Sequence, residues 1–117
     1  MQCMVRRGRL LTQMRKGALE YCVLAVLGAR EMYGLDLVRA LSEVDGMVLS
    51  EGTLYPLLSR LRKDDLVDTT WRESTSGPPR RYYRVTAEGR RALAEFTGEW
   101  RRFRDAVDTL LEERNGS

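Results

Sequence analysis

Hydroxyl and cationic side chains share one face of a predicted helix in the middle of the chain. At 100° per residue, Gly52, Pro56, Ser59 and Lys63 lie opposite the apolar residues of this segment, with Arg60 beside them. Such a face, small near the N-terminus of the helix and basic further along, suits insertion into the major groove of DNA. An ordinary solvated helix surface carries the same residue types, so the helix alone leaves both interpretations open.

The other side of this helix is a single apolar stripe. Leucines at positions 54, 57, 58 and 61 recur at i, i+3, i+4 and i+7, the pattern of a helix packed against a core. Ser50 can supply the N-cap oxygen, and Glu51 places a carboxylate in the first turn. Pro56 would then lie beyond the first turn and remove a backbone hydrogen bond, whereas a cap at Thr53 would bring it inside that turn. The sequence leaves the two starts open.

A β-hairpin is predicted directly after this helix. Residues 66–71 and 82–86 are rich in β-branched and aromatic side chains, which favour strands. Residues 72–81 between them are predicted as an extended loop, because a glycine and two prolines interrupt the pattern. Arg80 and Arg81 stand where this loop meets the second strand. The order predicts a winged helix-turn-helix, whose helix reads base edges while the wing lies along the phosphate backbone or the minor groove.

The residue types exclude several kinds of site. The chain has no histidine, so Ser-His and Cys-His nucleophile pairs and histidine-ligated metal sites are impossible. Its two cysteines cannot build a zinc site by themselves. Cys22 lies in an apolar run and is expected to be a reduced structural thiol, while a redox role for Cys22 or Cys3 stays open. The sequence also has no Walker loop, dinucleotide-binding glycine motif or paired-carboxylate signature, so we expect a protein that is not an enzyme and uses no cofactor and no metal.

Positive charge is concentrated in two regions. The 117 residues carry a net charge of +3, with five basic and no acidic residues in 1–16 and a second basic stretch at 73–86. Both regions suit phosphate contacts. The expected organisation is a basic arm over 1–12, a winged-helix domain over 13–86 and a dimerisation helix over 87–114. Because the sequence has neither an apolar run of about 18 residues nor a signal-peptide core, we expect a cytoplasmic protein without a membrane partner.

The helices at the two ends of the chain need partners. The predicted helix over 13–28 is apolar on most sides, whereas the one over 33–41 should turn Leu37, Val38, Leu41 and Val44 inward. After residue 86 no proline occurs, and six apolar residues are spaced 3, 4, 3, 4 and 3 as a heptad seam. The seam predicts a homodimer, with an intramolecular hairpin as the alternative. Residues expected at the dimer interface are Met14, Ala18, Tyr21, Leu93, Phe96, Trp100, Phe103, Val107 and Leu110.

Two long segments resemble the PadR family of bacterial transcriptional regulators. They read GTLYPLLSRL at residues 52–61 and GPPRRYYRVTAEG at 77–89, within a resemblance that extends over 13–111. The resemblance implies a dimeric winged-helix repressor of double-stranded operator DNA. It also places Tyr33 where its hydroxyl could contact a phosphate, with a packed tyrosine as the alternative. Residues expected to bind DNA are Tyr33, Ser50, Gly52, Thr53, Tyr55, Pro56, Ser59, Arg60, Lys63, Gly77, Arg80, Arg81 and Tyr82.

Trp100 stands at the centre of the heptad seam. In multidrug-responsive PadR proteins, a tryptophan at the corresponding point faces its symmetry mate, and flat aromatic ligands stack between the two indoles. The resemblance therefore implies a small planar aromatic ligand held by Trp100, Phe96, Phe103 and Tyr21, with plain dimer core as the alternative. Two hypotheses of other classes stay open: a winged-helix protein-interaction module without DNA binding, and a ligand-binding protein without a DNA function.

Overall fold

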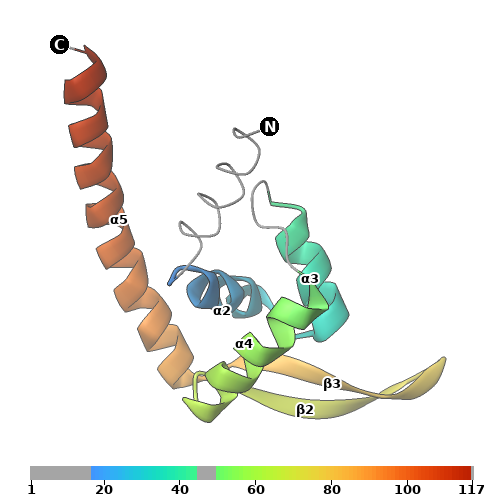
Figure 1. Cartoon of the computed structure of the whole chain (residues 1–117). Coiled ribbons are helices and arrows are strands. Elements are labelled where there is room, and N and C mark those ends of the chain that lie inside the picture. The colour runs from blue at the N-terminus through green and yellow to red at the C-terminus, as the bar shows by residue number, and fades with distance from the viewer. Residues whose placement is uncertain (1–16, 45–49, 117) are drawn as a thin grey trace, which may run out of the picture.

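The computed structural model describes residues 17–44 and 50–116 (Figure 1). The predicted basic arm, Met14 and Cys3 lie outside the described residues. In chain order the elements are α2 (Leu19–Ala29), β1 (Met32–Tyr33), α3 (Gly34–Ser42), α4 (Glu51–Lys63), β2 (Val67–Ser74), β3 (Gly77–Val85) and α5 (Ala87–Gly116). This predominantly helical chain with one small antiparallel sheet confirms the predicted fold class, a winged helix-turn-helix followed by a C-terminal helix.

The core lies between α2, α3, α4 and one face of the sheet. The predicted leucine stripe of α4 is buried, and Leu54 and Leu61 have no exposed surface. The buried residues around it are Val23, Leu24, Leu27, Met32, Leu37, Leu41, Val67, Tyr83 and Val85. The expectation that Val44 faces inward is wrong: its side chain is 54 % exposed, because α3 ends at Ser42 and Val44 lies beyond the helix.

Ser50 caps α4. Its side-chain oxygen accepts a hydrogen bond from the backbone N–H of Thr53 at 3.3 Å, and the helix begins at Glu51. Of the two starts that the sequence leaves open, the structure therefore has the earlier one. Pro56 consequently lies inside the helix, where it cannot donate to the carbonyl of Gly52. Because Gly52 is exposed, water can reach that carbonyl.

The hairpin strands are longer than the sequence predicts. β2 runs to residue 74 and β3 begins at Gly77, so the expectation of an extended loop over 72–81 is wrong, and the hairpin ends in a tight turn. Pro78 and Pro79 can be part of β3 because this strand pairs with β1 only at Tyr82 and Tyr83. Further out, β3 pairs with β2 alone among the described residues, and its register there is irregular. Edge strands and irregular positions tolerate proline, which cannot donate to a strand ladder.

β1 is a strand that the sequence does not predict. It pairs Met32 with Tyr83 and Tyr33 with Tyr82, which gives the sheet the order β1-β3-β2. Two residues are too few for an alternating pattern to show in the sequence. The strand ties the connection between α2 and α3 to the hairpin, and it brings Tyr33 against the outer face of β3.

The base of α5 is fixed to the sheet by a threonine and a glycine. The Thr86 hydroxyl donates to the carbonyl of Asp65 at 2.6 Å and accepts from the N–H of Gly89 at 2.9 Å. The N–H of Thr86 donates to the carbonyl of Leu66 at 3.0 Å. Gly89 approaches that carbonyl so closely that a Cβ would overlap it. These contacts therefore fix the angle between the first turn of α5 and the sheet.

Most of α5 extends away from the rest of the molecule (Figure 1). Near its base, Leu93 packs against the core, and the Phe96 ring stacks on Tyr21 of α2 with centroids 4.2 Å apart. Farther along, Phe103 is 63 % exposed and Leu110 is 66 % exposed. No helix within residues 17–44 and 50–116 is both long and apolar enough to cross a membrane.

Candidate nucleic-acid interface

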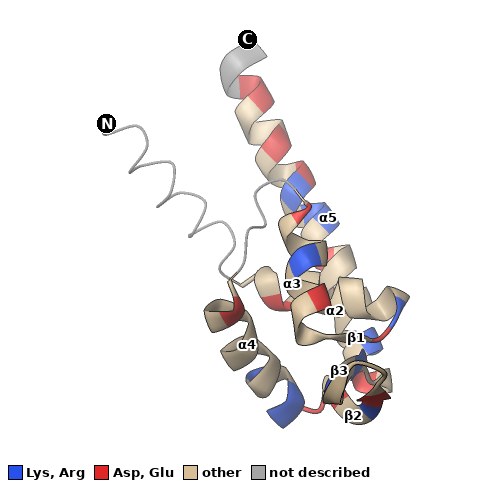
Figure 2. Ribbon diagram, turned by 90° about the vertical axis from the view of Figure 1, so that its right-hand side faces the viewer, with Lys and Arg blue, Asp and Glu red and all other residues tan. Residues whose placement is uncertain are grey.

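The polar face of α4 lies at the surface, opposite its buried leucines. The capping Ser50 and every α4 residue expected to contact DNA are exposed. These α4 residues are Gly52, Thr53, Tyr55, Pro56, Ser59, Arg60 and Lys63. The basic residues of α4 gather at its C-terminal end and an acidic residue lies in its first turn (Figure 2). The positive charge of the helix is therefore displaced toward the hairpin.

Arg60 forms an ion pair with α2. One of its guanidinium N–H groups donates to the Oε1 atom of Glu20 at 2.7 Å. The Arg60 side chain is still 58 % exposed, so other N–H donors of the guanidinium face solvent. Lys63 forms no ion pair within the described part of the chain. The two predicted cations of α4 thus differ in how freely they could reach a phosphate.

Tyr55 joins α4 to α3. Its ring lies against Gly34, the first residue of α3, where a Cβ would overlap the phenol. Burial, followed by the charges of Glu51 and Tyr83, raises the pKa of the Tyr55 hydroxyl. The hydroxyl therefore stays protonated at neutral pH and can donate a hydrogen bond. With 40 % of its surface exposed, Tyr55 both packs between two helices and borders the polar face of α4.

Arg80 and Arg81 lie on opposite faces of the hairpin. Arg81 pairs with Trp71 across the two strands, and its guanidinium carbon lies 4.9 Å from the centroid of the indole ring. Arg80 instead lies over the ring of Tyr33 in β1, at 4.6 Å. Stacking on an aromatic face orients a guanidinium plane while leaving N–H donors at its edge. Both arginines predicted from the sequence are therefore held in defined positions.

Arg72 forms a third arginine stack, which sequence reasoning missed. Its guanidinium lies 4.8 Å from the centroid of Tyr82 and forms an ion pair with Glu31, which precedes β1. Tyr82 and Tyr33 are themselves in contact, with ring centroids 5.8 Å apart. Because Arg72 is opposite Arg80 in the hairpin register, two arginines and two tyrosines share one face. Only the strand register shows that these residues share a face. Because the sequence predicts that the first hairpin strand ends at Trp71, it gives Arg72 no place in that register.

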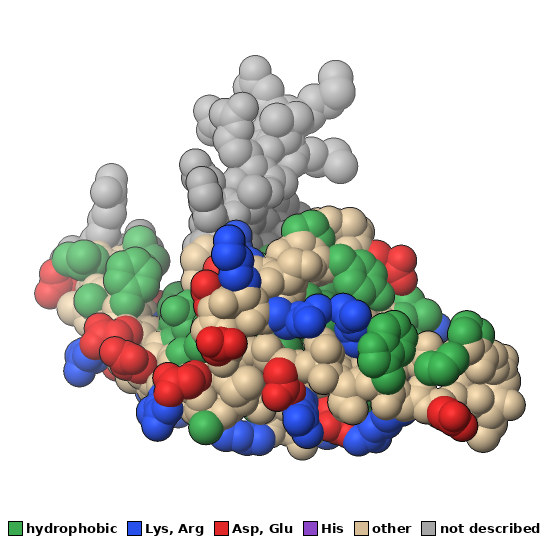
Figure 3. Space-filling view, turned by 90° about the horizontal axis from the view of Figure 1, so that it is seen from below, with side chains coloured by type: hydrophobic (Ala, Val, Ile, Leu, Met, Phe, Trp, Pro, Cys, Tyr) green, Lys and Arg blue, Asp and Glu red, His purple; other side chains and the backbone are tan. Residues whose placement is uncertain are grey.

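The rest of the hairpin surface carries mixed charge. Arg84 donates to Asp68 at 2.6 Å, and this hydrogen bond, together with the carboxylate charge, raises the pKa of Arg84. Trp71 is 60 % exposed, and Gly77 is exposed beside the turn. Seen from below, basic and acidic side chains alternate over the surface, with hydrophobic ones between them (Figure 3). The stacked arginines, and not a uniform positive field, distinguish the wing.

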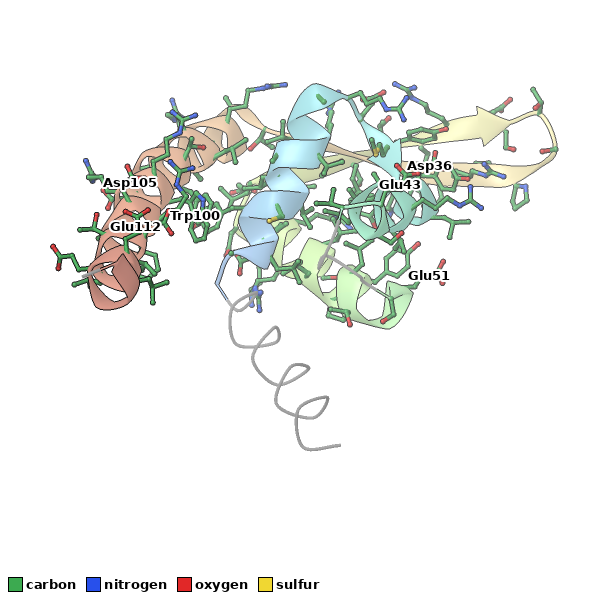
Figure 4. The ribbon with its side chains drawn as sticks, turned by 90° about the horizontal axis from the view of Figure 1, so that it is seen from above. Asp36, Glu43, Glu51, Trp100, Asp105 and Glu112 are labelled. Carbon is green, nitrogen blue, oxygen red and sulfur yellow. The ribbon has the colours of Figure 1, made fainter. Side chains whose placement is uncertain are left out.

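The four residues expected to bind a ligand form a row of rings that begins at Tyr21 on α2 and continues along α5. Beyond the Tyr21 and Phe96 stack, the ring centroids of Phe96 and Trp100 are 6.1 Å apart, and those of Trp100 and Phe103 are 6.4 Å apart. Figure 4 shows Trp100 on the side of α5 that is nearer α2. Trp100 is 42 % exposed, so part of its indole is open to solvent.

The other residues expected at a dimer interface differ in burial. Ala18, Leu93 and Val107 are half-buried, whereas Leu110 is exposed. Leu93 already packs within its own domain. The exposed part of the seam therefore begins at Trp100 and continues toward the C-terminal end of α5.

Cys22 is a free, half-buried thiol. Burial raises the pKa of this thiol, which favours the protonated form. Among the described residues, no group of three histidine, cysteine, aspartate or glutamate side chains could hold a metal ion.

Comparisons with known proteins agree with this geometry. Residues 23–95 match the model of the family described as "Transcriptional regulator PadR-like family". A transcriptional regulator of Mycobacterium tuberculosis is 36 % identical over 85 residues, which are 73 % of this chain and 78 % of that protein.

Solved structures extend the similarity to nearly the whole chain. A PadR family transcriptional regulator from Eggerthella lenta is 36 % identical with a TM-score of 0.84, over 96 % of this chain and 97 % of that one. A PadR-like transcriptional regulator from Bacillus cereus is 39 % identical with a TM-score of 0.79, over 86 % of this chain and 97 % of that one. The family match covers more than half of the chain, and family membership makes the protein a DNA-binding regulator and not an enzyme. The chain belongs to the PadR-like family of transcriptional regulators.

Proposed function

We propose that the protein represses transcription as a homodimer on a palindromic operator. In each protomer α4 would enter the major groove, and the β2–β3 hairpin would lie along the adjacent minor groove. The observation that carries this proposal is the division of α4 into two faces, with Leu54 and Leu61 fully enclosed and Ser59 and Lys63 exposed. A helix held by its buried side presents a fixed set of side chains, as base reading requires. A dimer bound to a promoter in this way would prevent RNA polymerase from binding the same DNA.

The contacts divide by chemistry. On α4, Ser59 and Tyr55 carry hydroxyls that can hydrogen-bond base edges, and Lys63 carries a charge suited to a phosphate. On the wing, Arg80 and Arg81 point to opposite sides. A hairpin placed along the minor groove has a phosphate strand on each side, so arginines on both faces could be used together.

The exposed part of the α5 seam supports the dimer. Trp100, Phe103 and Leu110 lie on one side of the helix at heptad spacing, and each is at least 42 % exposed. A second copy of α5 would cover these side chains, and burying apolar surface contributes about 25 cal/mol for each Å² removed from water. A two-fold dimer formed in this way would place two α4 helices on successive half-sites.

The ring row supports release by a planar aromatic ligand. Such a ligand would stack against Trp100 and its symmetry mate, with Phe96 and Phe103 beside them. It would release the operator only if it bound more tightly to a dimer in which the two α4 helices have the wrong separation, since equal affinity for both states shifts nothing.

Selection from a random duplex library tests the DNA-binding part. Enriched fragments should contain two similar half-sites whose centres are about 34–36 Å apart, or a multiple of that distance. Transcription in vitro from a promoter carrying such a fragment should then fall as protein is added. Enrichment of no sequence would contradict operator binding, and a rise in transcript would show activation in place of repression.

A further inference from the structure

An ion pair at the surface joins α4 to α2. Glu20 and Arg60 are 40 residues apart in the sequence, yet their side chains meet at 2.7 Å. The Glu20 side chain is 28 % exposed, whereas that of Arg60 is 58 % exposed. Glu20 is therefore the more confined partner, and Arg60, on a long flexible stem, is the one that can change position.

Arg60 lies on the flank of α4 and not at the centre of its polar face. On a helical wheel Lys63 is directly opposite the leucine stripe, and Arg60 is displaced from it by about 60°. Tyr55 lies on the other flank, against Gly34 of α3. In the pair with Glu20, the guanidinium is thus directed toward α2, away from the surface that would enter the groove.

We infer that Glu20 competes with a DNA phosphate for the guanidinium of Arg60, and that Glu20 thereby lowers the affinity of the protein for DNA. This inference rests on the proposed placement of α4 on DNA. A phosphate and the Glu20 carboxylate offer Arg60 the same charge-assisted hydrogen bond. While Glu20 holds Arg60, the protein uses one cation fewer in its contact with the DNA backbone.

The same segment of α2 contacts the seam helix. Tyr21, the residue after Glu20, stacks on Phe96 of α5 with centroids 4.2 Å apart and ring planes within 2°. Phe96 in turn neighbours Trp100. Two consecutive residues of α2 therefore contact α4 and α5, one each. The stack on Phe96 restrains the α2 backbone next to Glu20, which agrees with Glu20 being the more confined partner of the ion pair.

The size of the effect follows from the exposure of the pair. Exposed ion pairs have coupling energies that correspond to a change in affinity of up to about fivefold. Glu20 is accordingly expected to adjust affinity and not to switch it off. Each additional phosphate that the protein neutralises also makes the negative slope of log K against log salt steeper by about 0.9.

The test is a double-mutant cycle on the full chain. The variants are Glu20→Gln, Arg60→Gln and the double variant, and the probe is a fluorescent mixed-sequence duplex of about 30 base pairs, long enough for two half-sites. Fluorescence anisotropy gives affinity at salt concentrations from about 50 to 200 mM. Glu20→Gln should bind about two- to fivefold more tightly at low salt, with a steeper salt slope. In the Arg60→Gln protein the same change should have little effect.

Two further variants separate the local contact from net charge. Glu88→Gln removes an equal charge from a carboxylate that pairs with Arg91 on α5, and it should leave affinity nearly unchanged. Glu20→Asp keeps the charge but shortens the side chain, so it should also tighten binding, by less than Glu20→Gln. Circular dichroism and thermal unfolding establish that each variant is folded.

The outcomes distinguish this inference from the proposed function. If the wild-type protein binds no duplex, the placement of α4 on DNA fails and the inference fails with it. If the wild-type protein binds but Glu20→Gln binds equally or more weakly, only the inference is overturned. A gain that is as large in the Arg60→Gln protein would also overturn it, because the effect would then be one of net charge.

Discussion

The ring of Tyr55 occupies the space that a side chain at Gly34 would fill. This contact lies between the first turn of α3 and the first half of α4, the two helices of the helix-turn-helix. It sets how closely the helices approach one another, and so it helps to orient the polar face of α4. A glycine at position 34 is therefore a requirement of packing.

Gly34→Ala should lower the free energy of unfolding by about 1–3 kcal/mol, the usual cost of overpacking a closed contact. Urea denaturation measures the change. Gly52→Ala is the matched control, since its Cβ would meet only the Ser50 hydroxyl oxygen at 3.8 Å. The control should be neutral or slightly stabilising, because alanine favours helix by about 1 kcal/mol over glycine. Equal stability of Gly34→Ala and wild type would show that the helices can separate freely.

Arg80→Ala and Arg81→Ala should each weaken binding to all duplexes alike, because each removes a stacked cation from one face of the wing. The slope of log K against log salt should become shallower by about one for each phosphate that the variant no longer neutralises. Arg84→Ala is the control within the same hairpin, since Asp68 already holds Arg84, and it should have a smaller effect. Unchanged affinity of the double Arg80 and Arg81 variant would exclude the wing from the DNA contact.

Ser59→Ala should change sequence preference more than overall affinity. A hydroxyl that contacts a base edge discriminates between bases, and a good base contact contributes about 1–3 kcal/mol of discrimination. Repeating the library selection with the variant shows whether one operator position becomes degenerate. A selected sequence identical to that of the wild type would place Ser59 away from the bases.

Phe103→Ala should weaken a dimer formed through α5 by about 2 kcal/mol, or roughly 30-fold in Kd, as expected for a central apolar contact. Sedimentation velocity over a range of concentrations measures the shift. Arg102→Ala is the control on the adjacent, charged side of the helix, and it should leave the dimer intact. If a chain truncated after Thr86 sedimented as the same dimer, the seam would not be the interface.

Planar aromatic cations should quench tryptophan fluorescence through Trp100. The indole is partly exposed within a row of rings, and an aromatic stack adds about 0.5–1.5 kcal/mol beyond buried area. Comparison with the Trp100→Ala protein isolates this signal, and Trp71 serves as an internal reference because Arg81 covers one of its faces. If Trp71 accounts for all of the quenching, or no compound changes operator affinity, Trp100 is dimer core only.

Cys22 should react slowly with a disulfide reagent in the folded protein. Burial raises the pKa of its thiol, so at pH 8 less thiolate is present than in the unfolded chain. Reaction should accelerate as pH rises toward the folded-state pKa. Folding should lose some stability as pH rises from the pKa of the unfolded chain to that of the folded protein, because the folded state favours the protonated form. The measurement uses a Cys3→Ser background. Fast modification at neutral pH would point to a thiol sensor.

Local patterns in the sequence predict the elements that short-range physics decides. The leucines of α4 recur at helical spacing because one face of the helix is buried. The orphan N–H groups of the first turn call for a capping side chain, which Ser50 or Thr53 could supply, and the structure decides for Ser50. The heptad spacing from Leu93 onward likewise predicts a helix, and α5 confirms it.

What the sequence could not predict depends on residues brought together from a distance. Pro78 and Pro79 indicate a loop, yet an edge strand tolerates them, so neither the hairpin register nor the face on which each arginine lies could be predicted. The contact between Glu20 and Arg60 has no sequence signal, because it depends on how α2 and α4 cross.

The clamp at the base of α5 gives the helix the properties of a stiff lever. With 30 residues, α5 is about 45 Å long. Because Thr86 and Gly89 fix its angle to the sheet, a tilt at the seam would carry the whole winged domain with it as one body. A tilt of only about 5° along that length moves the far end by about 4 Å, more than the rise of about 3.4 Å per base pair of DNA. Small repacking among the rings of the seam would therefore be enough to put the two α4 helices out of step with the grooves.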